Sequence, residues 1–372
     1  MRRAVIYPFS VRSLPVFTYF PIFRPEYEIS ALVSPPGLGL AGRGPAYAAN
    51  RSGQIAPLVE SRIAAPLERS DALIIPWGDW KTDPAYCDIL PVLYRAAERG
   101  KEIFCCLKLA ASQAKELKKI CRAHGAAFHD GFLEPANVRG QIPYGPYTAN
   151  APVVFVHNLG IEADSFEVVL SLAARFRRDG YRASVIGPRP EYNILGFCAP
   201  APLLNMAYGN RRLKDVPQFV AQLQLRVHLI ELQEKPDVIL LHSPGAAMPE
   251  SSFLRDANGI CTYLLTRAVQ PDFSLACVTY GRSSAEELLA VHYELKYQYG
   301  FGIDAAHLSN RIAAPADARP ARPDECFFLP EDQALEAARR MRTEAFACIP
   351  VFSALNGEEQ ELLYAQVRKC LK

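Results

Sequence analysis

Short apolar runs alternate with amphipathic stretches along most of the chain. In the first part, apolar runs of strand length occur at 4–7, 29–33, 72–75 and 102–107. Patterns with helical spacing follow or separate them at about 61–70, 88–100 and 112–124. Strands that alternate with helices are typical of a mostly parallel, doubly wound sheet. The pattern therefore predicts an N-terminal α/β domain over residues 1–133.

A second α/β pattern follows a stretch rich in proline and glycine, 134–150, which is predicted to be a linker. This second domain covers 151–372. Its predicted strands are 152–157, 183–187, 237–242, 274–279, 303–309 and 325–329. Its main predicted helices are 165–179, 216–234, 258–269, 284–299, 332–342 and 357–371. The fold class predicted for the chain is two doubly wound, mostly parallel three-layer α/β domains, of which the first is Rossmann-like.

Composition excludes several classes of protein. A hydrophobic content of 50% over 372 residues is that of a globular chain with a large core, and a net charge of +2 argues against a nucleic-acid partner. No apolar stretch reaches the ~18 residues of a membrane helix, and no signal segment precedes the first strand, so we expect a cytoplasmic protein without a membrane partner. The ten cysteines form no C-x₂-C pair, which argues against zinc-ribbon and iron–sulfur sites.

The run from Asp237 to His242, with Ser243 and Gly245 in the turn after it, carries the strongest motif. Such a run predicts a buried parallel strand that brings its last side chain to the carboxyl edge of the sheet. It resembles the strand of MinD-type and nitrogenase-iron-protein-type P-loop ATPases that ends in an acidic residue and helps to organise Mg²⁺. His242 stands at that position here. The resemblance implies a P-loop-NTPase-like second domain that lacks this carboxylate.

The predicted phosphate loop is degenerate in the same way. An apolar strand is followed by Asn158, Gly160, Asp164 and Ser165, and then by a helix pattern. A working loop reads Gly-x-x-x-x-Gly-Lys-Ser/Thr, so that N–H groups and a lysine hold the phosphates. Gly160 matches the first glycine, but no lysine follows, and carboxylates beside a helix N-terminus would compete with a triphosphate. An ordinary loop with Asp164 or Ser165 as helix N-cap is the alternative.

Two later segments extend the resemblance. Asn310 and Arg311 match an Asn-Arg pair that places an amide against adenine in MinD-type ATPases, and 325–332 resembles their next strand with its Pro-Glu-Asp turn. The resemblance thus implies a base-binding corner. Without the lysine and the magnesium carboxylate, we expect nucleotide to bind weakly or not at all, and we predict no cofactor.

Two other groups at the predicted sheet edge offer alternatives. Arg189, Glu191 and Tyr192 follow a strand and could bind an anionic or polar ligand, or could form a rigid connection with solvated side chains. His157 and His242 end two strands and could bind a transition metal, although a histidine at a strand end is more often a hydrogen-bonded structural residue. The sequence leaves these alternatives open.

Several stretches together resemble a bacterial, notably clostridial, family of peptide-maturation proteins. They are Tyr7-Pro-Phe-Ser10, Ser34-Pro-Pro-Gly-Leu-Gly-Leu-Ala-Gly42, Phe166-Glu167 and Gly180-Tyr-Arg-Ala-Ser-Val-Ile-Gly-Pro-Arg189. Such proteins are encoded beside radical-SAM maturases and short precursor peptides. The resemblance implies an accessory or scaffold role in maturing a ribosomally synthesised, post-translationally modified peptide, with the precursor peptide and the maturase as partners. An enzyme that acts at the same sheet edge is the alternative function.

Overall fold

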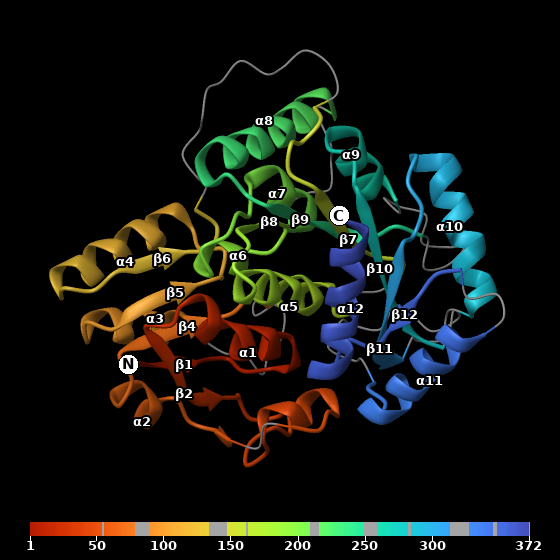
Figure 1. Cartoon of the computed structure of the whole chain (residues 1–372). Coiled ribbons are helices and arrows are strands. Elements are labelled where there is room, and N and C mark those ends of the chain that lie inside the picture. The colour runs from red at the N-terminus through yellow and green to blue at the C-terminus, as the bar shows by residue number, and fades with distance from the viewer. Residues whose placement is uncertain are drawn as a thin grey trace. The chain divides into compact units, whose positions relative to one another are not determined.

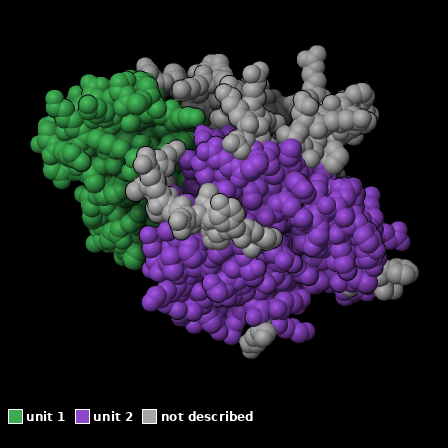
Figure 2. Space-filling model, turned by 90° about the horizontal axis from the view of Figure 1, so that it is seen from above, with its two compact units in different colours: residues 1–135, 189–199 green, residues 136–188, 200–372 purple. Residues whose placement is uncertain are grey.

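The computed structural model divides the chain into two compact units (Figure 2). Unit 1 contains 1–135 and 189–199, and unit 2 contains 136–188 and 200–372. The described residues are 1–53, 56–78, 89–133, 147–160, 163–208, 216–248, 259–281, 284–312, 327–344 and 348–371. Segment 189–199 therefore lies outside the unit to which the predicted boundary at 151 assigned it. Most of the predicted linker, 134–146, lies outside the described residues.

Unit 1 is built on a six-stranded sheet in the order β3-β2-β1-β4-β5-β6, with parallel pairing throughout. The strands are β1 (Arg2–Ile6), β2 (Tyr27–Val33), β3 (Val59–Glu60), β4 (Ala72–Ile75), β5 (Glu102–Cys105) and β6 (Phe128–Asp130). The helices are η1 (Val11–Ser13), α1 (Leu14–Phe23), η2 (Pro45–Ala49), α2 (Ala64–Glu68), α3 (Ile89–Glu98), α4 (Ala111–Ala123) and α6 (Glu191–Ile194). This is the strand order of the Rossmann fold, whose direction of winding reverses between β1 and β4.

Helices cover both faces of the unit 1 sheet, which explains why its central strands are apolar throughout. All four residues of β4 are buried. One face packs against α2, α3 and α4, where Leu93 and Leu117 join the core. On the other face the Phe20 ring of α1 meets the Phe104 ring of β5 edge-on at 5.1 Å.

Unit 2 contains a second six-stranded parallel sheet, in the order β12-β11-β10-β7-β9-β8. Its strands are β7 (Val153–Asn158), β8 (Ala183–Ile186), β9 (Val238–Ala246), β10 (Phe273–Tyr280), β11 (Ala305–Ile312) and β12 (Val351–Phe352). Its helices are α5 (Ser165–Arg178), α7 (Ala201–Tyr208), α8 (Val216–Glu234), α9 (Ile260–Ala268), α10 (Ala285–Tyr299), α11 (Glu331–Thr343) and α12 (Gly357–Cys370). The sequence-based fold class, two three-layer parallel α/β units, is confirmed (Figure 1).

One predicted strand of unit 2 is misplaced. In the expected strand 325–329, residues 325 and 326 lie outside the described chain, and Phe328 forms only an isolated antiparallel bridge with Arg311. The edge position beside β11 belongs instead to β12. The aromatic run 327–328 has strand-like composition, but Phe327 is exposed rather than buried against a helix.

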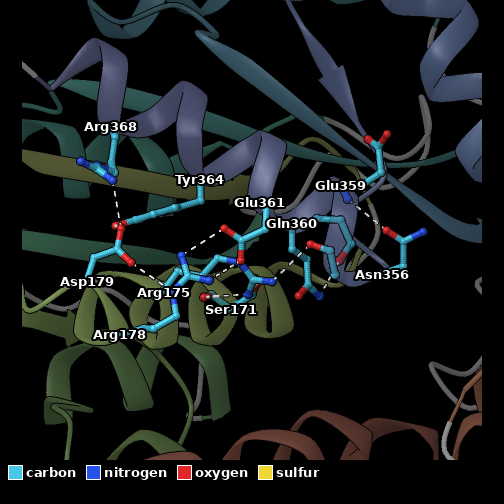
Figure 3. A network of polar contacts seen from close by, with 12 residues as sticks. Ser171, Arg175, Arg178, Asp179, Asn356, Glu359, Gln360, Glu361, Tyr364 and Arg368 are labelled. Atoms are coloured by element: carbon cyan, nitrogen blue, oxygen red, sulfur yellow. Dashed lines mark hydrogen bonds and ion pairs between the residues drawn. The ribbon is translucent and has the colours of Figure 1, made fainter.

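Helices α5 and α12 pack against each other, and α5 also packs on β7, β8 and β9 (Figure 1). A polar network runs along their contact (Figure 3). Arg175 and Arg178 of α5 both pair with Glu361 of α12. Asp179 accepts hydrogen bonds of 2.9 Å from the Tyr364 hydroxyl and from Arg368. The network links α12 to α5, the helix that begins at the predicted phosphate loop. None of the described helices is long and apolar enough to cross a membrane.

Candidate functional site

The candidate site of unit 2 lies where β7 ends and α5 begins. β7 pairs with β9 on one side and β10 on the other. Val156 of β7 is the register partner of His242 in β9. Because side chains alternate between the faces of a strand, Asn158 and His242 project on one face of the sheet and His157 on the other.

Asn158, Ser165 and His242 form a buried chain of hydrogen bonds. The Asn158 Nδ2 donates to Ser165 Oγ at 3.0 Å, and Ser165 Oγ lies 2.8 Å from His242 Nε2. The Asn158 Oδ1 accepts from the N–H of Ala163 at 2.9 Å, which closes the loop onto the strand end. The structure thus brings together three of the predicted site residues, in a network that satisfies its own polar groups.

Asp164 is the centre of a second buried cluster. Its carboxylate accepts hydrogen bonds from Ser309 Oγ at 2.5 Å and from Arg311 Nε at 3.0 Å. The Asp164 and Arg311 side chains are only 5% and 11% exposed. Asp164 precedes α5 as its N-cap residue but makes no side-chain capping hydrogen bond. Its φ of 60° is a left-handed conformation that Asp adopts more readily than most residues.

The helix start defines the register of the degenerate loop. The stretch from Asn158 to Ser165 has the same length as Gly-x-x-x-x-Gly-Lys-Ser/Thr. With Ser165 as the hydroxyl residue at the first helical position, Asn158 and Ala163 occupy the glycine positions and Asp164 the lysine position. This register places Asn158, and not Gly160, at the position of the first glycine. A Cβ atom on Gly160 would meet no atom within 4 Å, so close packing does not require glycine there.

His307 also belongs to this cluster, although the sequence analysis did not single it out. It is fully buried, and its Nδ1 accepts from the N–H of Ala354 at 3.0 Å. A neutral ring then carries its proton on Nε2, which lies 3.8 Å from Asp164 Oδ2. The signal available in the sequence was a histidine inside the apolar run of β11. Its register partner is Cys277, and burial raises the pKa of that thiol well above its ordinary value, so the thiol stays protonated.

The Asn310–Arg311 pair serves the fold in this structure. Asn310 is fully buried, and its Nδ2 donates to the carbonyl of Leu329 at 2.7 Å. Arg311 binds Asp164 and lies over the ring of Phe328 at 5.3 Å. Both side chains therefore make contacts within unit 2, and the base-binding corner stays a prediction.

His157 has a structural environment on the opposite face of the sheet. Its Nε2 lies 3.1 Å from Ser274 Oγ, and its ring packs against Phe155 and Phe301. Burial lowers the pKa of His157 to about 4, so the ring is neutral at physiological pH. The alternative metal pair of His157 and His242 is wrong, because the two side chains leave opposite faces. Across the described ranges, His, Cys, Asp and Glu side chains form no group of three that could hold a metal ion.

Ser243 and Gly245 continue β9 instead of ending it. Ser243 lies on the face opposite His242, where its Oγ is 3.3 Å from Thr262 Oγ1 of α9. Gly245 has a φ of 73°, which glycine adopts without strain. The strand extends to Ala246, beyond its predicted end at His242.

The loop that contains Arg189, Glu191 and Tyr192 belongs to unit 1 and not to the unit 2 sheet edge where it was expected. Arg189 Nη2 donates to Glu191 Oε1 at 2.9 Å, and both side chains are buried. Tyr192 is a fully buried core residue of this unit. The alternative of solvated side chains is therefore excluded for this loop.

Neither a protein-family model nor a curated protein matches the chain. Among solved structures, it is similar to a DUF1611 family protein from Anabaena variabilis, with 13% identity and a TM-score of 0.62 over 99% of this chain and 100% of that one. The likeness shows that the two chains share their fold over both units.

Weaker matches cover part of the chain. A nucleotide-binding protein in complex with ADP from Archaeoglobus fulgidus aligns with 60% of this chain and 88% of its own, at 12% identity and a TM-score of 0.31. A GTPase from Pyrococcus abyssi aligns with 58% of this chain and 96% of its own, at 12% identity and a TM-score of 0.29.

The charged side chains at the edge of the unit 2 sheet determine which reactions this site could support. Phosphoryl transfer needs a cation that neutralises the β- and γ-phosphates and a carboxylate that helps to hold Mg²⁺. Asp164 stands at the first position and His242 at the second. The charge at the lysine position is thus reversed, and that carboxylate is bound to Arg311 within the protein.

Proposed function

We propose that this chain is a non-hydrolysing accessory protein that binds a ribosomally synthesised precursor peptide and its radical-SAM maturase. The class of partner rests on the resemblance of the sequence to peptide-maturation proteins. We propose that the chain does not hydrolyse NTP because of one observation. The buried Asp164 carboxylate stands at the lysine position of the loop and forms an ion pair with Arg311.

Electrostatics supports this proposal. A triphosphate placed at the start of α5 would meet the Asp164 carboxylate where a P-loop offers a lysine, so attraction becomes repulsion. Binding would also require the Asp164–Arg311 pair to open, and separating a buried pair costs about 3–5 kcal/mol. Contacts with the base alone would then give the protein only a small affinity for a nucleotide.

Calorimetry tests the binding part of the proposal. The full chain is titrated with the cognate precursor peptide and, separately, with the maturase, and we expect saturable binding to at least one. Peptide with a scrambled sequence is the control. If neither the peptide nor the maturase binds, the accessory role is wrong.

A hydrolysis assay tests the second part. We expect no magnesium-dependent release of phosphate from ATP or GTP above the rate without protein. The variant Asn158→Gly/Ala163→Gly/Asp164→Lys restores the loop motif, yet we expect no turnover, because residue 242 remains His and the new lysine faces Arg311. Robust magnesium-dependent hydrolysis by the unmodified chain would refute this part and leave the peptide-binding result to be judged by itself.

A further inference from the structure

The outward face of helix α4 in unit 1 carries a row of positive charges. Lys115, Lys119 and Arg122 are exposed and follow one another at spacings of four and three residues, so their side chains share one face of the helix. Leu117 and Cys121 are fully buried on the opposite face, where they join the core of unit 1. We call the three cations the basic row.

The acidic side chains near the basic row bind other residues. Glu116 is the only acidic residue of α4, and it accepts a hydrogen bond of 2.6 Å from the Tyr94 hydroxyl of α3. Asp130 of β6 lies 3.9 Å from the amine of Lys118. No member of the basic row forms an ion pair or a side-chain hydrogen bond with another residue of the described ranges. The charges of the row therefore face solvent without an acidic neighbour that neutralises them.

The basic row is unfavourable for the helix by itself. Lys115 and Lys119 are four residues apart, Lys119 and Arg122 are three apart, and like charges at these spacings destabilise a helix. The helix dipole stabilises cations in the last turn, which accounts for Arg122. It does not account for Lys115, which precedes the last turn by more than one turn. The fold thus gains nothing from the row as a whole, whereas a negatively charged partner would turn the repulsion into attraction.

The surroundings of the row indicate which kind of anion fits it. Within 89–123, the described residues include no exposed large apolar or aromatic side chain, so the surface offers neither an anchor for a membrane nor a platform for stacked bases. Its three cations are fewer than the ~6–10 phosphate contacts of a strong nucleic-acid binder. From Lys115 to Arg122 the row rises about 10 Å along the helix axis. Alternate side chains of an extended peptide, about 6.6 Å apart, cover this length with two or three carboxylates.

We propose that the basic row of α4 docks an acidic segment of a polypeptide. The Arg122 guanidinium can bind one carboxylate through two parallel hydrogen bonds, while Lys115 and Lys119 act as point charges. Complementary charge of this kind mainly steers the partner and selects it against neutral or basic segments. The surface belongs to unit 1, and the proposal does not depend on the precursor peptide or the maturase as partner.

Fluorescence anisotropy measures the docking. The full chain is titrated at low ionic strength into labelled hexaglutamate and, separately, into labelled hexaglutamine, its neutral match. We expect saturable binding of hexaglutamate alone, and this binding should weaken as salt is added, because salt screens exposed charges. In Lys115→Gln/Lys119→Gln we expect about tenfold weaker binding, since each exposed ion pair contributes up to about fivefold. Glutamine has nearly the helix propensity of lysine, so α4 should remain folded, which circular dichroism checks.

Two further double variants separate the basic row from net charge. Lys296→Gln/Lys369→Gln is the matched control, because it removes two exposed lysines from α10 and α12 of unit 2 and changes the net charge equally. We expect it to bind hexaglutamate as the unmodified chain does. Lys115→Glu/Lys119→Glu reverses the charge of the row, and we expect it to lose hexaglutamate and to bind labelled hexalysine more tightly than the unmodified chain does.

Several results of these titrations would overturn the proposal. No saturable binding of hexaglutamate, or equal losses in the two glutamine variants, would show that the row docks no acidic segment. Equal binding of hexaglutamate and hexaglutamine would remove the role of charge. Tighter binding of an oligothymidylate of equal charge would assign the row to a nucleic acid, and tighter binding of phosphatidylserine vesicles would assign it to a membrane surface.

Discussion

Replacing Asp164 with Asn tests whether the negative charge at the lysine position stabilises the folded state of unit 2. Asn tolerates the left-handed backbone at residue 164 nearly as well as Asp does, and its amide oxygen can still accept from Ser309. The substitution therefore removes mainly the negative charge. Arg311 then keeps its positive charge next to a neutral partner in a buried site.

The exposure of the pair determines the size of the effect. Surface ion pairs contribute about 0–1 kcal/mol, because water screens them. The Asp164 and Arg311 side chains are 5% and 11% exposed, so screening is weak. Breaking a buried pair costs about 3–5 kcal/mol, and the hydrogen bonds that Asn retains place our expectation near the lower end, at about 3 kcal/mol. With Asp164→Asn/Arg311→Met, no charge remains unpaired, and we expect a loss of about 1 kcal/mol.

Urea unfolding measures these free energies with a control inside the chain. Both tryptophans, Trp77 and Trp80, belong to unit 1, whereas far-ultraviolet circular dichroism reports on both units. Loss of stability in unit 2 should move the dichroism transition to lower urea and move the fluorescence transition less. A double-mutant cycle then gives the coupling between residues 164 and 311, for which we expect at least about 2 kcal/mol. A cost below about 1 kcal/mol for Asp164→Asn, or additive losses in the double variant, would refute the reasoning.

Three other substitutions test the remaining parts of unit 2. Ser165→Ala removes the link between Asn158 and His242 and should cost about 2 kcal/mol in urea unfolding, against about 1 kcal/mol for the control Ser243→Ala. Glu361→Ala, at the more exposed α5–α12 contact, should cost less than about 1 kcal/mol, and a larger loss would show that this network orders α5. Burial lowers the pKa of His157 from its ordinary 6.5 to about 4, so unfolding takes up a proton between these values. His157 should therefore contribute a fall in stability of up to about 3 kcal/mol from pH 6.5 to pH 4. His157→Phe should reduce the total fall by that amount, and an unchanged fall would contradict the assignment.

The pattern of apolar residues in the sequence predicts most elements, because the residues of a buried parallel strand are apolar at consecutive positions. β4 and β7 are buried at every position, and their apolar runs identify them directly. The same signal cannot assign the 189–199 segment to a unit. Arg189 and Tyr192 follow β8 closely in sequence, but Glu191 bonds to Trp77, which is 114 residues away. Tertiary contacts of this kind decide the boundary, and no local pattern records them.

Strand register sets a second limit on how much of the candidate site the sequence can predict. From the sequence, His157 and His242 are two histidines at the ends of two strands, a pattern compatible with a metal site. Whether they meet depends on the pairing of β7 with β9, and a slip of one residue would reverse the face of every side chain. The partner of Asp164 is likewise 147 residues away, in β11. The sequence alone thus indicates which P-loop residues are missing, whereas the contacts show that buried pairs formed by Asp164 and Ser165 occupy their place. We therefore expect that restoring one motif residue will not restore nucleotide chemistry, because each of these side chains also satisfies a buried partner.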